Sequence, residues 1–109
     1  MPITNLKVND FISQYMNSNQ PYTLLDVREK QEYAEARISG SLHIPMHQVP
    51  GECDNLPQDL PLIVMCRSGQ RSLMVADVLS SMGFENLLNL DGGILAWIKA
   101  GQAIESDED

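Results

Sequence analysis

The sequence has few cysteines, few basic residues and no long apolar run. Its two cysteines, Cys53 and Cys66, are too few for a disulfide framework and favour a reduced compartment such as the cytoplasm. Seven Lys and Arg stand against fifteen Asp and Glu, and the net charge of −8 disfavours nucleic acid and anionic membranes as partners. No apolar run approaches the ~20 residues of a membrane span. The first residues also lack a secretory signal pattern, so we expect a cytoplasmic protein without a membrane partner.

The length indicates one domain. A chain of 109 residues is too short for two independent cores, and its 43% hydrophobic content is enough for one packed interior. We predict a domain over residues 1–104, followed by an acidic tail over residues 105–109 that frays from the domain.

Strand-like and helical patterns alternate along this domain. Nearly continuous apolar runs predict strands at residues 22–27 and 62–65, with weaker signals at 42–44 and 86–90. Apolar stripes predict helices at residues 11–16, at 73–82 and from Gly92-Gly93 to Gly101. Four prolines and a glycine predict a long surface loop over residues 45–61. This alternation predicts an α/β fold with a mostly parallel sheet and helices on both faces.

The chemistry is concentrated in one polar loop, Cys66-Arg67-Ser68-Gly69-Gln70-Arg71-Ser72. The loop follows a buried strand and precedes a helix, so it lies where open α/β sheets bind ligands. The helix directs its free N–H groups and positive dipole end at the loop, which favours the thiolate form of Cys66. The loop also holds two of the seven basic residues. Because charges are screened over about 8–10 Å, these near charges outweigh distant acids and create a local anion site.

A free cysteine is commonly a small buried hydrophobe, and that is the plain alternative for Cys66. Its place after an apolar strand, the paired arginines Arg67 and Arg71, and Gly69 favour a nucleophile instead. We expect both arginine side chains to face solvent and to orient an anionic substrate, while Gly69 lets the backbone curl toward the sulfur.

Other polar residues carry weaker signals. Asp26 and Arg28 are most simply a structural ion pair near the site. His43, His47 and Cys53 are separated by prolines that prevent alignment on one helix, and they do not complete a ligand set, so we predict no metal site.

The loop resembles the active-site loop of the rhodanese-like sulfurtransferases. Further segments similar to that family follow in the family's order: Leu25-Asp26-Val27-Arg28-Glu29, Glu32-Tyr33, Ile38-Ser39-Gly40-Ser41, His43-Ile44-Pro45 and Leu90-Asp91-Gly92-Gly93 with Trp97. The resemblance covers about residues 3–101. It implies a five-stranded, largely parallel sheet and a persulfide carried on Cys66. Arg37 departs from the family pattern, because many members have histidine there.

The spacing of the loop distinguishes this family from its phosphatase relatives. Tyrosine-phosphatase loops place five residues between the cysteine and the phosphate-binding arginine, whereas here Arg71 follows Cys66 after four and Ser72 takes the later position. The phosphatase and arsenate-reductase relatives carry a longer loop that admits a tetrahedral oxyanion. The resemblance therefore favours sulfur as the transferred group.

The expected function is a thiosulfate sulfurtransferase. The Cys66 thiolate would attack a small anionic sulfur donor, and cyanide or a protein dithiol would then remove the sulfur. Residues 67–71 would bind the donor and cradle the persulfide with their backbone N–H groups. No cofactor is implied, because the sulfur is held covalently. A phosphatase or arsenate reductase using the same cysteine, or a non-catalytic binding module, are the alternatives.

Overall fold

The fold is built from short strands and helices that alternate along the chain. A computed structural model describes residues 3–107. The strands are β1 (Thr4–Lys7), β2 (Thr23–Asp26), β3 (Leu42–His43), β4 (Leu62–Met65) and β5 (Leu87–Asp91). The α-helices are α1 (Val8–Phe11), α2 (Lys30–Glu35), α3 (Val49–Glu52), α4 (Gln70–Ser81) and α5 (Gly93–Lys99). A π-helical segment continues α1 over Ile12–Met16, and 3₁₀ turns flank α3 at Met46–Gln48 and Cys53–Asn55.

The five strands form one parallel sheet in the order β1-β5-β4-β2-β3. This confirms the predicted α/β class with its five-stranded sheet. The central strand β4 is buried at all four residues, as its uninterrupted apolar sequence predicts. The edge strands β1 and β3 are mostly exposed.

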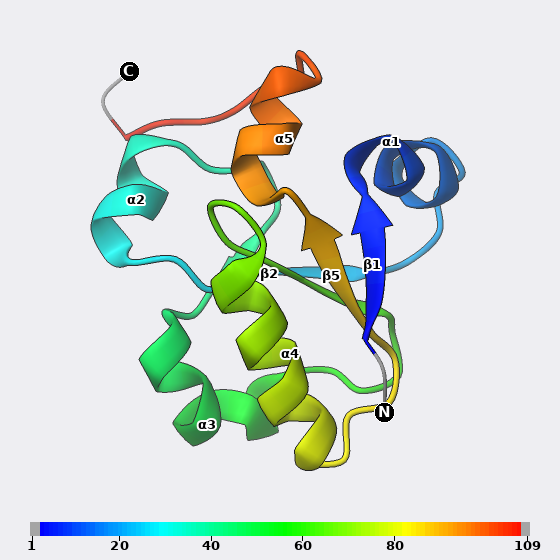
Figure 1. The fold of residues 1–109 in the computed structure, drawn as a ribbon, viewed down its shortest axis with the longest axis vertical. Helices are drawn as coiled ribbons and strands as arrows, with labels where there is room; N and C mark the ends of the chain where they lie inside the picture. Colours follow the sequence, from blue (N-terminus) through cyan, green and yellow to red (C-terminus); the bar gives the residue numbers. More distant parts are fainter. Residues whose placement is uncertain (1–2, 108–109) are drawn as a thin grey trace.

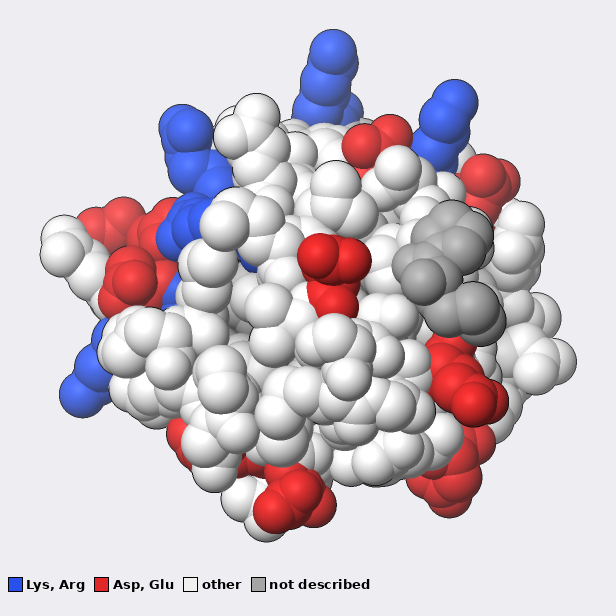
Figure 2. Space-filling model, turned by 60° about the horizontal axis from the view of Figure 1, so that its bottom comes forward, with Lys and Arg blue, Asp and Glu red and all other residues white. Residues whose placement is uncertain are grey.

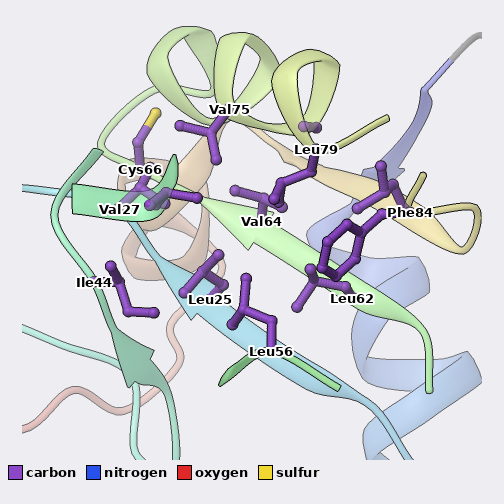
Figure 3. Packing of buried hydrophobic residues seen from close by; sticks show 13 residues of the cluster. Leu25, Val27, Ile44, Leu56, Leu62, Val64, Cys66, Val75, Leu79 and Phe84 are labelled. Carbon is purple, nitrogen blue, oxygen red and sulfur yellow. The ribbon is translucent and has the colours of Figure 1, made fainter. Parts of the chain in front are cut away.

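Alternate residues of the sheet serve two separate apolar layers. Leu62 and Val64 of β4 face one layer, in which they pack with residues of α3 and α4, as Figure 3 shows for α4. Ile63 and Met65 face the other layer, which includes residues of α1 and α5. Helices therefore cover both faces of the sheet, and Figure 1 shows α4 and α1 on different sides of it. Because β4 is enclosed on both faces, Cys66, which follows it directly, is held in a fixed position.

Three elements differ from the sequence-based prediction. The strand β1 and the helix α2 were not located by periodicity, since each is short and neither shows a clear apolar stripe. The prediction of an irregular loop over residues 45–61 is wrong, because α3 lies within it between two 3₁₀ turns. Pro50 is in the first turn of α3, where proline costs no helical hydrogen bond and its fixed φ suits the helix.

The acidic tail also differs, in the part that the structure describes. Glu105 exchanges two backbone hydrogen bonds of 2.9 Å with Arg37, and the side chain of Arg37 forms a 2.7 Å ion pair with Asp107. The guanidinium of Arg37 also lies over the ring of Tyr33. The prediction of a frayed tail is therefore wrong for residues 105–107, while its last two residues lie outside the described part. Arg37 thus holds residues 105–107 beside α2.

No helix within residues 3–107 is long and apolar enough to cross a membrane.

Candidate active site

Cys66 lies at the carboxyl end of the central strand. It follows Met65, the last residue of β4, and only 1% of its surface is exposed. In Figure 3 it lies at the edge of the apolar cluster, with its sulfur directed away from Leu25. The chain then turns through Gly69, whose φ of +102° suits glycine, and α4 begins at Gln70. The thiol therefore lies on the inner side of a tight loop.

Two hydrogen-bond donors reach the sulfur. The backbone N–H of Gly69 donates to Sγ over 3.1 Å, and the Ser72 hydroxyl lies 3.4 Å from Sγ. Burial raises the pKa of the Cys66 thiol. Hydrogen bonds from the Ser72 hydroxyl and from the backbone N–H groups of Ser72, Gly69 and Ser68 lower it. Together these hydrogen bonds outweigh burial, so the pKa of Cys66 falls below its ordinary value. The main lowering contributions are therefore hydrogen bonds from residues 68–72 rather than the charges of the two arginines.

A buried asparagine orients Ser72. Asn89, in the interior strand β5, is 2% exposed, and its Oδ1 accepts from the Ser72 hydroxyl over 2.5 Å. Its Nδ2 donates to Asn5 Oδ1 over 3.0 Å and to the carbonyl of Gly69 over 3.2 Å. Since Ser72 has one hydroxyl proton, Asn89 and a Cys66 thiolate compete for it. Sequence reasoning missed Asn89, although a polar residue within an apolar parallel strand is the signal that identifies it.

Gly93 allows α5 to approach the back of the loop. The backbone N–H groups of Ile94 and Leu95 donate to the carbonyls of Cys66 and Arg67 over 2.9 and 3.2 Å. A Cβ atom on Gly93 would lie 2.3 Å from the Cys66 carbonyl oxygen and 2.5 Å from that of Arg67. These two carbonyls are therefore satisfied by α5, and only glycine fits at position 93.

The two loop arginines differ in their surroundings. Arg67 is exposed, as expected. Arg71 is half-buried, and its guanidinium forms a two-pronged ion pair with Glu32 of α2, with N–O distances of 2.8 and 2.9 Å. The expectation that both arginines face solvent is thus wrong for Arg71. Two further residues expected to contact substrate, Ser68 and Gln70, are exposed.

Asp26 and Arg28 form a buried ion pair beside the loop. Arg28 Nη2 lies 2.8 Å from Asp26 Oδ2, with side chains 4% and 0% exposed. The backbone N–H of Arg28 donates to Asp26 Oδ1 over 3.0 Å, and Nη2 also donates to the carbonyl of Ala36 over 2.5 Å. Each charge is thereby matched by a partner, and the pair joins the end of β2 to the end of α2.

Two further candidate residues, His43 and Cys53, contact residues outside the loop. His43 stacks on Tyr33 with ring centroids 4.2 Å apart, and its Nε2 lies 2.8 Å from the Arg28 carbonyl. Cys53 is half-buried, and its thiol donates to the Pro50 carbonyl over 3.4 Å. Within residues 3–107, no group of three or more His, Cys, Asp or Glu side chains is placed to hold a metal ion.

The hydroxyl of Ser72 is expected to control the ionisation of Cys66. Ser72→Ala removes a hydrogen bond to the thiolate, so the pKa of Cys66 should rise and the thiolate fraction at neutral pH should fall. We expect Cys66 to react with iodoacetamide about three- to tenfold more slowly at pH 7. Peptide-resolved alkylation measured against pH provides the test. Ser81→Ala is the matched control, since this serine is on the same helix and its hydroxyl donates to the Val78 carbonyl; an unchanged profile for Ser72→Ala would contradict the role of Ser72.

The close approach of α5 should make position 93 intolerant of any side chain. Gly93→Ala places a methyl group against two loop carbonyls, so we expect both a lower melting temperature and slower alkylation of Cys66. Gly101→Ala provides the matched control, because Gly101 also has a positive φ (+79°) but no atom within 4 Å of the added Cβ. Gly101→Ala should cost about 1 kcal/mol from backbone strain alone and leave alkylation unchanged. Equal effects of the two variants on Cys66 would refute the packing argument.

Comparison with known proteins points to one family. The family model described as Rhodanese-like domain matches residues 9–100. A sulfurtransferase of Allochromatium vinosum is 34% identical over 100 residues, covering 92% of this chain and 94% of the relative. A thiosulfate sulfurtransferase GlpE of Pseudomonas fluorescens is 37% identical over 78 residues, covering 72% of each chain. The crystal structure of a rhodanese-related protein from Thermoplasma volcanium superposes with a TM-score of 0.82 at 31% identity, covering 94% of this chain and 97% of that one.

Proposed function

The chain belongs to the rhodanese-like domain family, and from this premise we propose that it is a sulfurtransferase with a persulfide intermediate on Cys66. The donor is thiosulfate or a similar carrier of sulfane sulfur, and the acceptor is a thiophile such as cyanide or a protein dithiol. Relatives of about 35% identity that are named sulfurtransferases support the general activity. The choice of donor and acceptor is our own inference.

The observation that carries the proposal is the set of hydrogen-bond donors around the Cys66 sulfur. A thiolate is the attacking form of cysteine, and the lowered pKa of Cys66 increases its population at neutral pH. The same donors suit the terminal sulfur of a persulfide, which also carries negative charge. A buried cysteine that served only to fill the core would not need the backbone N–H and hydroxyl donors that reach its sulfur.

The proposed reaction has two half-reactions. In the first, the Cys66 thiolate attacks the outer sulfur of thiosulfate, a sulfur–sulfur bond forms, and the sulfur–sulfur bond of the donor breaks to release sulfite. The protein is left as a persulfide anion, so charge and atoms balance. In the second, cyanide attacks the terminal sulfur of the persulfide. The sulfur–sulfur bond to Cys66 breaks, thiocyanate leaves, and the Cys66 thiolate is restored. Because Cys66 must be a free thiol before each cycle, a reducing compartment such as the cytoplasm suits the reaction.

Phosphatase or arsenate-reductase activity has less support. Phosphoryl transfer needs cations that stabilise the three equatorial oxygens of the transferred group. In the structure, both terminal nitrogens of Arg71 are bonded to Glu32 rather than open to an oxyanion. A non-catalytic binding module has less support too, since it does not require the lowered pKa of Cys66.

Sulfur uptake by Cys66 is expected to be directly measurable. After thiosulfate treatment, the wild-type protein should gain the mass of one sulfur atom on the Cys66 peptide, and cyanide should remove it as thiocyanate. Cys66→Ser should gain none, because a serine hydroxyl does not form a persulfide, whereas the matched variant Cys53→Ser should behave as wild type. Intact and peptide mass spectrometry read the outcome, with aryl phosphate hydrolysis measured in parallel. Absence of sulfur uptake, or thiocyanate formation by Cys66→Ser at the wild-type rate, would reject the proposed function.

A further inference from the structure

The ion pair between α2 and the loop limits the charge available to a donor. Both terminal nitrogens of Arg71 are bonded to Glu32, Nη1 to Oε1 at 2.8 Å and Nη2 to Oε2 at 2.9 Å. This parallel geometry is the strongest pairing that a guanidinium and a carboxylate form. A substrate anion that bound to Arg71 in the same way would have to displace the Glu32 carboxylate.

Glu32 is itself held in position. Its Oε1 accepts a 2.9 Å hydrogen bond from the backbone N–H of Glu29, which forms part of the capping box that begins α2. The hydrogen bond with Arg71 is the main reason that the pKa of Glu32 is lowered to about 2. Glu32 therefore keeps its negative charge throughout the pH range of an ordinary assay, and Arg71 stays paired.

The remaining charges near the loop offer little compensation. The hydrogen bond to Glu32 is the main cause of the raised pKa of Arg71. The charges of Glu32, the Cys66 sulfur and the Glu29 carboxylate raise this pKa by smaller amounts, in that order. Arg67 is exposed and makes no ion pair with another described residue. The protein as a whole carries a charge of −8, and in the view of Figure 2 the acidic side chains are spread around the molecule, while the basic ones lie toward its upper and left edges. A small dianion approaching the loop thus meets Arg67 as the loop guanidinium that is not paired with a carboxylate of the described residues.

We propose that Glu32 is a specificity-determining residue, which by occupying both arms of Arg71 weakens the binding of thiosulfate, a dianion, and makes an alkyl hydropersulfide, R–S–SH, the preferred class of donor. The inference rests on the proposed function and narrows its donor. A hydropersulfide carries at most one negative charge at its sulfur. Pairing of Arg71 with Glu32 therefore costs it less electrostatic attraction than it costs a dianion. Arg67 is then the cation that supplies the remaining attraction for thiosulfate.

The chemistry with this donor is balanced. The Cys66 thiolate attacks the outer sulfur of R–S–SH, a new sulfur–sulfur bond forms, and the bond between the two donor sulfurs breaks. The donor leaves as the thiol R–SH after taking the proton, and the protein retains a persulfide anion. No oxidant or reductant is needed, since one persulfide replaces another.

The test measures the first half-reaction with two donors. Sulfur uptake on Cys66 is followed by mass spectrometry over a range of thiosulfate concentrations, and separately over a range of 2-hydroxyethyl hydropersulfide generated in situ. Glu32→Gln removes the charge while its amide oxygen still accepts from Glu29. We expect this variant to reach half-saturation at about three- to fivefold less thiosulfate, with a steeper dependence on salt and an unchanged maximal rate. Half-saturation with the hydropersulfide should not change.

Two further variants complete the experiment. Glu35→Gln is the matched control, because it removes one charge from the same helix at a residue that accepts a hydrogen bond from Gln31, whereas Arg71 pairs with Glu32; it should leave uptake from both donors unaffected. Arg67→Gln in the wild-type background should raise the half-saturating thiosulfate concentration several-fold and flatten its salt dependence. A thermal melt shows whether Glu32→Gln destabilises the protein. If it does, Arg67→Gln still tests whether Arg67 supplies the attraction for thiosulfate.

The outcomes separate the two proposals. Uptake from hydropersulfide that is more efficient than from thiosulfate, with the expected response to Glu32→Gln, supports the inference. More efficient uptake from thiosulfate by the wild type, or the same thiosulfate dependence for a folded Glu32→Gln protein, overturns the role of Glu32 while the sulfurtransferase proposal stands. Uptake from neither donor rejects both.

Discussion

The hydrogen bonds that converge on the sulfur of Cys66 are the interaction on which the rest of the site depends. Burying a thiolate without partners would be costly, because an apolar environment favours the neutral thiol. The N–H of Gly69 and the hydroxyl of Ser72 supply those partners, and the pKa of Cys66 falls despite its burial. The surrounding structure can be understood as the support that holds these donors in place.

That support comes from each neighbouring element. The central strand β4 is covered on both faces and fixes the position of Cys66, and α5 binds the loop carbonyls through Ile94 and Leu95. Because α5 supplies the donors to these carbonyls, the N–H of Gly69 donates to the sulfur of Cys66 instead. Asn89 contacts Ser72 from the next strand. The loop donors thus surround the sulfur before any substrate arrives, and under the proposed function this arrangement favours catalysis by electrostatic stabilisation.

The sequence indicates the parts of this arrangement that depend on local pattern. The apolar run of β4, the helix that ends before Gly83 and the place of Cys66 between them follow from burial and periodicity. The pairing of Arg71 with Glu32 and the contact of Asn89 with Ser72 join residues far apart in the chain, which spacing alone does not reveal. For the same reason the exposed role expected for Arg71 was wrong, and Asn89 was missed. The helix α3 was missed because prolines near it were interpreted as helix breakers, although Pro50 lies in its first turn.

A crystal structure of the protein after treatment with a sulfur donor is the most direct test of the central claim. We predict one additional sulfur atom bonded to Cys66 Sγ, lying within hydrogen-bond distance of the backbone N–H groups of the loop, with Cys53 unmodified. An additional sulfur on Cys53, or one on Cys66 that points away from the loop and accepts no hydrogen bond from it, would contradict the claim that these donors exist to hold a negative sulfur.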